Sequence, residues 1–235
     1  MSTIIDYAPR LWEGLVVTLQ LLVLGSLLAL VIAFAAGLTR LSRHRLVRLP
    51  AAIFIEVFRG TSMIVQLFWF FYALPFLGIE LPPFETGVVV LALNEGAYAA
   101  EIVRGAIKSR PAGQTEACIA LGIGPAKRMR RILIPQSIPA MLPPFGNVLV
   151  DLFKNTSLVA TITVLDLTYM GLEVRTNTGE TTAIFATLLV IYFVVSLLLW
   201  VLMNGLERRF AIDRTKKSTR IKSWILSQPR GGAGA

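Results

Sequence analysis

Three pairs of opposite charges lie within stretches of the sequence that are otherwise apolar. In each pair an acid is followed three residues later by a base: Glu56 and Arg59, Glu101 and Arg104, and Asp151 and Lys154. Residues three apart on a helix share one face, so each pair can neutralise itself as an ion pair. A charged side chain at the centre of a bilayer costs roughly 2.5 to 3.5 kcal/mol on insertion scales, so such pairs turn inward or toward water. The chemistry open to them is internal neutralisation or contact with a charged solute.

Depth within the apolar stretches separates these polar groups into two sets. Glu95, Asp151, Lys154 and Asn155 lie deep, whereas the other two pairs lie toward the cytoplasmic ends, where they would stabilise the bundle or form a gate. A zwitterionic solute needs a cation for its carboxylate and an acid for its ammonium or amidinium group. The deep set is therefore the better candidate for solute contact. The predicted solute path or gate comprises these residues: Glu56, Arg59, Gln66, Glu95, Glu101, Arg104, Asp151, Lys154 and Asn155.

Other site chemistries find little support in the sequence. The single cysteine, Cys118, excludes an intramolecular disulfide. With only one histidine, His44, there is no cluster for a metal ion and no usual pairing of nucleophile and base. We therefore predict no metal site, no cofactor bound by this chain and no catalytic residues, and an intramembrane enzyme is disfavoured.

Composition places the chain in a lipid bilayer. Of its 235 residues, 55% are hydrophobic and only 16% are charged, and the mean hydropathy is +0.68. These values do not fit a water-soluble surface. The net charge of +9 does not indicate a nucleic-acid partner, because the basic residues lie mostly between apolar runs rather than on one face of a soluble fold.

The elements that must position the polar residues are membrane-spanning helices. A bilayer core about 30 Å thick needs roughly 20 helical residues. The first apolar run is too long for a signal peptide and follows a segment that is not positively charged, so we expect it to be retained. The sequence predicts an all-α permease domain over 14–206 with five spans, an outer segment 1–13 and a basic tail 207–235. The spans are 14–38, 50–77, 86–104, 140–164 and 183–205.

The distribution of Lys and Arg predicts the orientation of these spans. Nineteen of the 23 lie in 39–49, in 104–139 and beyond residue 206, and only Arg10 and Arg175 lie in the other connections. Cytoplasmic loops carry an excess of Lys and Arg. We therefore expect the N-terminus outside and the C-terminus in the cytoplasm, with the basic tail lying near anionic lipid.

The longest cytoplasmic connection, 111–135, is predicted to be structured. A short helix ends at Gly122, and Pro125 suits the first turn of a second helix, which we expect to end at Pro135. A helix, a glycine turn and a second helix would thus lie beneath the membrane. Taken alone, this pattern fits an amphipathic hairpin at the lipid surface or an element that docks onto a soluble partner.

The residues of this connection resemble the EAA loop of binding-protein-dependent ABC importer permeases. EAC at 116–118 is followed by Gly122 and then by ILIP at 132–135. Flanking stretches resemble the polar amino-acid uptake branch of that family: EVFRGTSMIVQLF, GAYAAEIVRGAI, GQTEACIALG, ILIPQSIPAMLPPFGN and KNTSL. Departures include Cys118, where alanine is usual, Ile134 for leucine, Ser62 for proline, and Glu95, where an uncharged residue is expected.

The resemblance implies a type I ABC importer permease fold and a division of labour among chains. Two ATPase subunits would grip two such loops, ATP and Mg would bind those subunits, a second permease chain would complete the pathway, and an extracytoplasmic binding protein would deliver the solute. No G-x-x-x-x-G-K-[ST] sequence occurs in this chain, so ATP must bind elsewhere. The residues implied in coupling to the ATPase are Glu116, Ala117, Cys118, Ala120, Leu121, Gly122, Ile132 and Pro135.

The sequence leaves three questions open. A secondary transporter or channel could use the same charged spans, although it predicts internal repeats and no docking loop. The stretches FYALPFLGIELPPFETG and LEVRTNTGE resemble permeases for ectoine and hydroxyectoine, against ordinary polar amino acids or opines. The second permease could be a sister chain or another copy of this one.

Overall fold

The computed structural model describes residues 6–210, and every regular element in that range is a helix. Residues 1–5 of the predicted outer segment 1–13 and residues 211–235 of the predicted basic tail 207–235 lie outside the described residues. Two segments are π-helical, Trp69–Ala73 (η1) and Met129–Leu133 (η3). Two others are 3₁₀-helices, Leu74–Leu77 (η2) and Thr156–Ile162 (η4). In chain order the elements are α2 (Ala8–Arg40), α3 (Arg45–Gly60), α4 (Met63–Phe68), η1 (Trp69–Ala73), η2 (Leu74–Leu77), α5 (Pro83–Lys108), α6 (Ala112–Ala120), α7 (Pro125–Arg128), η3 (Met129–Leu133), α8 (Ile134–Asn155), η4 (Thr156–Ile162), α9 (Leu167–Thr178) and α10 (Thr181–Phe210).

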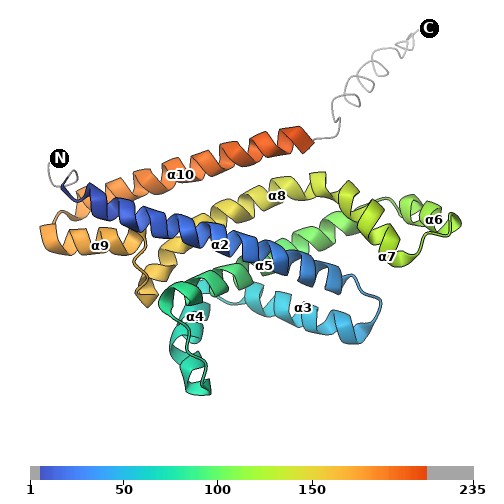
Figure 1. Ribbon diagram of the computed structural model, residues 1–235, viewed down its shortest axis with the longest axis horizontal. Coiled ribbons are helices and arrows are strands. Elements are labelled where there is room, and N and C mark those ends of the chain that lie inside the picture. Colours follow the sequence, from blue (N-terminus) through green and yellow to red (C-terminus); the bar gives the residue numbers. More distant parts are fainter. Residues whose placement is uncertain (1–5, 211–235) are drawn as a thin grey trace, which may run out of the picture.

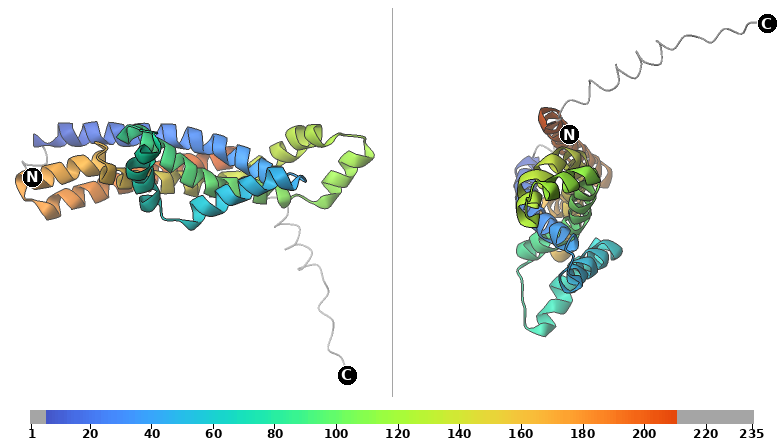
Figure 2. Two further views of the ribbon diagram at one scale, coloured as in Figure 1. Left: turned by 90° about the horizontal axis from the view of Figure 1, so that it is seen from below. Right: turned by 90° about the vertical axis from the view of Figure 1, so that its right-hand side faces the viewer.

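Three of these helices, α2, α5 and α10, are each long and apolar enough to cross a membrane. Two further spans arise if each of two bent helix pairs counts as one, which confirms the all-α architecture with up to five spans. The long helices run roughly along a common axis, and α2 lies beside α5 while α10 lies beside α8 (Figures 1 and 2).

Glycine allows α2 and α5 to approach closely. A Cβ at Gly37 would come within 2.7 Å of the Ala100 carbonyl oxygen, and one at Gly96 within 2.8 Å of the Ile32 side chain. Larger residues at these two positions would push the helices apart. Small residues at such crossings are typical of helix packing in membranes, where backbone proximity replaces the hydrophobic effect as the source of attraction.

The second predicted span is not one continuous helix. The chain breaks between Gly60 and Met63, and the segment Met63–Leu77 leaves α3 at 107°. In Figure 1 this segment projects away from the bundle. The break frees the Phe58 carbonyl, which accepts hydrogen bonds from Gln66 (2.9 Å) and Asn94 (2.9 Å). Side chains distant in sequence thus satisfy the backbone, and hydropathy alone could not reveal this.

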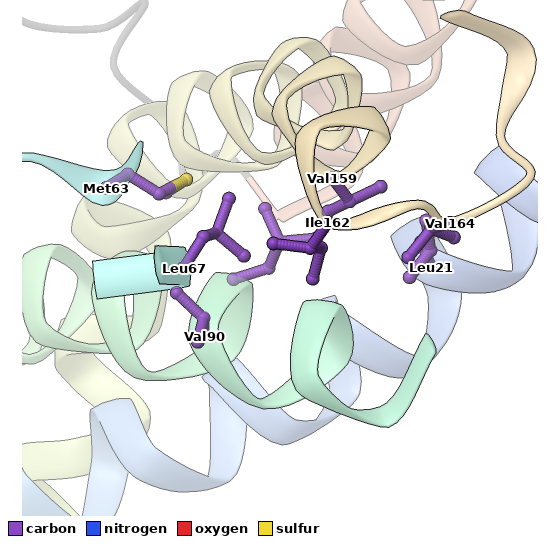
Figure 3. Close-up of a cluster of buried hydrophobic side chains, with 8 residues drawn as sticks. Leu21, Met63, Leu67, Val90, Val159, Ile162 and Val164 are labelled. Atoms are coloured by element: carbon purple, nitrogen blue, oxygen red, sulfur yellow. The ribbon is translucent and has the colours of Figure 1, made fainter. Parts of the chain in front are cut away.

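A buried apolar cluster fixes the first turns after this break. Figure 3 shows Met63 and Leu67 of the α4 segment directed toward Val90 of α5 and toward Val159 and Ile162 of η4. Leu67, Val90, Val159 and Ile162 are all fully buried. The start of α4 is therefore anchored in the bundle, even though the segment beyond it projects outward.

The expected end of a helix at Pro135 is wrong. The chain stays helical from Pro125 to Ile162, passing through the π-helical turn η3 directly before Pro135. A proline inside a helix lacks an N–H and its ring crowds the preceding turn. A wider π turn at that point accommodates such a residue without ending the helix. The predicted connection and the fourth span are consequently one long, irregular helix.

The helices define two ends of the molecule. At one, the α9 end, lie the N-terminal part of α2, the end of η4 and helix α9 (Figure 1). At the other, the α6 end, lie α6, α7, the connection from α2 to α3 and the C-terminal part of α10. The described Lys and Arg residues of the three basic regions therefore gather at the α6 end.

Candidate solute cavity and coupling loop

A cavity of about 490 Å³ lies between the break after α3, helix α5 and helix α8. It brings together all four residues predicted to lie deep, which come from two different spans. We call Glu95, Asp151, Lys154 and Asn155 the cavity set. The full lining is Thr61, Ser62, Met63, Asn94, Glu95, Tyr98, Val148, Asp151, Lys154 and Asn155.

The charges of the cavity set are loosely paired. Glu95 is only 4% exposed, and its Oε1 accepts a hydrogen bond from the Asn155 amide at 2.8 Å. The Lys154 ammonium lies 3.6 Å from Asp151 Oδ1, and both of these side chains are about 60% exposed. An exposed pair of this kind contributes well under 1 kcal/mol, so a solute can replace either partner at little cost.

Gln66 lies behind the cavity rather than in its lining. Its amide nitrogen donates to Phe58 and to the Thr61 hydroxyl (2.7 Å), and its amide oxygen accepts from Asn94 at 3.0 Å. These bonds fix the break that shapes one cavity wall. Sequence reasoning grouped Gln66 with the solute path but did not select Thr61, Asn94 or Tyr98. A polar side chain within an apolar stretch was the available signal for Asn94.

Four charged side chains form a separate group, which we call the ion network, near the α6 end. Arg40 contacts Glu56 Oε1 at 3.0 Å and Glu101 Oε1 at 3.3 Å, and Arg104 contacts Glu101 Oε2 at 2.7 Å. The network joins α2, α3 and α5. Of the expected pairs, Glu101 with Arg104 and Asp151 with Lys154 form, whereas Glu56 pairs with Arg40 and not with Arg59. From the sequence, Arg40 was predicted only as a loop charge.

Arg59 makes a different contact, with the cavity wall. Its guanidinium lies 5.1 Å from the centre of the Tyr98 ring, and the Tyr98 hydroxyl donates to the Arg59 carbonyl at 3.3 Å. A cation above an aromatic ring is attracted by the ring's electron-rich face. Arg59 therefore orients Tyr98, which lines the cavity, instead of neutralising Glu56 on its own helix.

The turn after α6 has the geometry of a glycine C-cap. Gly122 has φ of +68°, its N–H donates to the Ile119 carbonyl, and the Ile123 N–H donates to the Cys118 carbonyl, both at 2.9 Å. These are the two hydrogen bonds of a Schellman motif. A Cβ at Gly122 would meet no atom of the described chain within 4 Å, so glycine serves the backbone conformation there.

An apolar projection stands beside this turn. Leu121 is 76% exposed and Ile119 is also exposed, whereas Cys118 is buried and faces away from solvent. Exposed apolar side chains on a short rigid helix can enter a groove on a partner protein. Of the predicted coupling residues, Ile132 is half-buried and the exposed ones are Glu116, Ala117, Ala120, Leu121, Gly122 and Pro135.

The model of one protein family, the binding-protein-dependent transport system inner membrane component, matches residues 16–212. The chain belongs to this family. It is accordingly a multi-pass inner membrane protein, a transport component whose family works with a solute-binding protein.

Named relatives and a solved structure agree with the match. A probable amino-acid ABC transporter permease, y4tF of Sinorhizobium fredii, is 39% identical, over 86% of this chain and 87% of that protein. The glutamine transport system permease GlnP of Escherichia coli K12 is 38% identical, over 90% of this chain and 97% of that protein. A crystal structure of an amino acid ABC transporter with histidines superposes with a TM-score of 0.82 and 34% identity, covering 88% of this chain and 96% of that one.

This inner membrane component departs from the expected family pattern at Glu95 and Cys118, and the structure shows where both residues lie. Glu95 lines the cavity, so this departure places a carboxyl group in the cavity wall. Cys118 is buried on the inner side of α6, where a thiol behaves as a small apolar side chain. The first departure changes the cavity lining, and the second leaves the exposed projection unchanged.

Proposed function

We propose that this chain is the permease subunit of an ATP-driven ABC importer for zwitterionic amino acids or amino-acid-like solutes. The observation that carries the proposal is the cavity, where acids, a lysine and an amide from α5 and α8 meet. The names of the relatives, which transport amino acids, support the solute class. The basic α6 end would face the cytoplasm, with the N-terminus outside.

The cavity set suits a solute with charges of both signs. Lys154 would bind the solute carboxylate, and Glu95 with Asp151 would bind its cationic group, since charge-assisted hydrogen bonds are the strongest available. Asn155 already donates to Glu95 and so keeps that carboxylate oriented. With two acids and one base, the cavity favours solutes whose cationic part offers several N–H donors, such as an amidinium, a guanidinium or an ammonium.

The proposed assembly distributes the remaining tasks among other chains. Two ATPase subunits, which bind ATP and Mg, would contact the projection at Leu121 on each of two permeases. The second permease would be a sister chain or another copy of this one. An extracytoplasmic binding protein would release the solute at the α9 end. Closure of the ATPases would pull the α6 helices together and switch the pathway between outward-open and inward-open states.

Reconstituted transport tests the solute class and the energy source together. The permease, co-expressed with its ATPase and binding-protein partners, is placed in proteoliposomes, and uptake of labelled glutamine, arginine, octopine and ectoine is measured. We expect ATP-dependent uptake of at least one of these zwitterions and its loss in Glu95→Gln at unchanged assembly. Uptake driven by an ion gradient without the ATPase would identify a secondary transporter instead.

Gly122 provides a test of the coupling role. Gly122→Asn preserves access to the left-handed conformation, whereas Gly122→Val opposes it, and a Cβ at this position meets no atom of the described residues within 4 Å. We expect the valine variant to insert normally but to lose its ATPase during purification, and the asparagine variant to retain it. Equal retention by both would show that the turn is not part of the ATPase contact.

A further inference from the structure

A second hollow lies on the outside of the bundle, between α2, α8 and α10. It is an apolar groove of about 300 Å³ and shares only Val148 with the lining of the solute cavity. Its one polar lining residue, Ser26, donates to the Val23 carbonyl in its own helix at 3.0 Å. Its main walls are Leu27, Leu30, Phe145, Leu149, Leu152 and Met203. Nothing in this groove could bind a polar solute.

A polar recess of about 140 Å³ adjoins this groove toward the α6 end. The two hollows share Leu142 and Met203, and the recess adds Asn147, Asn204 and Glu207. Among residues 6–210, the Glu207 side chain has no hydrogen bond or ion pair. A half-buried carboxylate without a partner in the described chain is an attractive site for a small cation.

A proline of α8 interrupts the helical hydrogen bonds beside the recess. Pro143 lines the recess, and because it has no N–H, the carbonyl of Pro139 one turn earlier lacks its usual helical donor. The lining of the recess itself offers side-chain acceptors: the Glu207 carboxylate and the amide oxygens of Asn147 and Asn204.

The order of the two hollows follows the layers of a membrane. Glu207, Arg208 and Arg209 are three consecutive charges at the end of α10, which places this level at the headgroup boundary. The groove lies one to two turns deeper, beside the uniformly apolar part of α10, at the level of the acyl chains. A polar recess above an apolar groove matches a phospholipid, headgroup outward and tail inward.

We propose that this groove and recess form a specific site for one phosphatidylethanolamine molecule of the inner membrane. One acyl chain fills the groove, the ammonium group donates to Glu207 and the neighbouring acceptors, and Arg208 lies at the level of the phosphate. The carboxylate decides the headgroup: it attracts a primary ammonium and repels the uncompensated charge of phosphatidylglycerol. The lipid would join α10 to α8, the helix that also carries Asp151 and Lys154.

Native mass spectrometry of the full-length permease, purified with its co-expressed partners, tests the headgroup preference. The protein is exchanged against vesicles of dioleoyl-phosphatidylethanolamine or dioleoyl-phosphatidylglycerol, and retained lipids are counted. We expect the wild type to retain the ethanolamine lipid preferentially, and Glu207→Gln to lower that preference about fivefold. Glu85→Gln, an exposed acid in the first turn of α5, is the matched control and should leave the preference unchanged.

A second variant tests the tail site. Ser26→Phe places a ring in the groove and should reduce retention of both lipids, whereas Leu28→Phe, which lies on the same helix but outside the groove, should not. Thermal unfolding of all variants confirms that they are folded. Equal retention of the two lipids by the wild type, or a preference that survives both Glu207→Gln and Ser26→Phe, would mean that only annular lipid is bound and would overturn the proposal.

Discussion

The ion network and the cavity set contain similar residue types in the same bundle, yet they differ in how the charges are paired. In the ion network, Glu101 is 18% exposed and contacts two arginines at 3.3 Å or less. In the cavity set, the Asp151 and Lys154 charges are 3.6 Å apart and mostly exposed. The first arrangement satisfies its charges within the protein. The second keeps them available to something that enters the cavity.

This contrast shows that opposite charges at i,i+3 do not by themselves indicate a role. In the ion network, Arg40 of α2 contacts Glu56 of α3 and Glu101 of α5. These ion pairs join three helices and thereby stabilise the bundle. The cavity set keeps a local pair and a buried acid in the lining of the cavity, and its proposed role is contact with the solute. Breaking each group in turn should separate loss of stability from loss of transport.

The largest effect on uptake is expected from Glu101→Gln. This change leaves Arg40 and Arg104 without their shared carboxylate, which should cost about 2 kcal/mol of unfolding free energy and abolish uptake through loss of assembly. Glu56→Gln is the matched control, because Glu56 also contacts Arg40 but is 65% exposed, so its loss should cost well under 1 kcal/mol. Thermal unfolding in detergent measures both. Equal destabilisation by the two variants would contradict a network centred on Glu101.

The second largest effect on uptake is expected from neutralising Asp151 or Lys154. Asp151→Asn and Lys154→Gln should each lower uptake more than about tenfold while the unfolding midpoint and ATPase retention stay unchanged. Because each residue is proposed to contact a different pole of the solute, the double variant should transport no better than the worse single one. Recovery of uptake in the double variant would instead mean that the two residues only neutralise each other.

A smaller effect on uptake is expected from a change at Gln66, which lies behind the cavity. Gln66→Leu removes one of the two donors to the Phe58 carbonyl, together with the hydrogen bonds that Gln66 makes to the Thr61 hydroxyl and the Asn94 amide, which should cost about 1 to 3 kcal/mol. Uptake should fall only a few-fold, through distortion of the cavity wall. Gln114→Leu, at an exposed position with one weak side-chain contact, is the control. A variant with normal stability and no transport would assign Gln66 to the solute path.

The smallest effect on uptake is expected at Asp166, a buried acid beyond the fourth predicted span that has no ion pair among the described residues. Asp166 caps α9 through the Thr168 and Tyr169 N–H groups, and burial raises its pKa to about 6 from 3.8. The folded protein then holds this proton more tightly than the unfolded chain, so the free energy of unfolding falls as pH rises from about 4 to about 6 and is level above.

Asp166→Asn keeps a cap oxygen and removes the charge, so this variant should lack that decline and exceed the wild type in stability at pH 7. Asp166→Ala loses the cap and should be destabilised by about 1 kcal/mol relative to Asp166→Asn at every pH. Unfolding midpoints between pH 4 and 7.5 give the comparison. Wild-type stability that rises with pH relative to Asp166→Asn would show that the N–H groups, rather than burial, dominate the pKa.

The sequence by itself determined features that depend on local pattern. Apolar runs of sufficient length identified the membrane spans, because each helix must satisfy its own backbone in lipid. Gly122 marked the end of α6, because a left-handed residue there favours glycine. The cavity set was also found from the sequence, since deep charges in a bilayer need a protein or water environment.

Only the tertiary structure decided which charges meet and where helices bend. Arg40 pairs with Glu56 and Glu101 because α2 and α3 are packed against α5, and no local spacing encodes that contact. The 107° turn after α3 persists because Gln66 and Asn94 supply hydrogen bonds to the broken backbone. Local sequence sets the cost of burying a polar group, but its partner comes from whichever helix packs beside it.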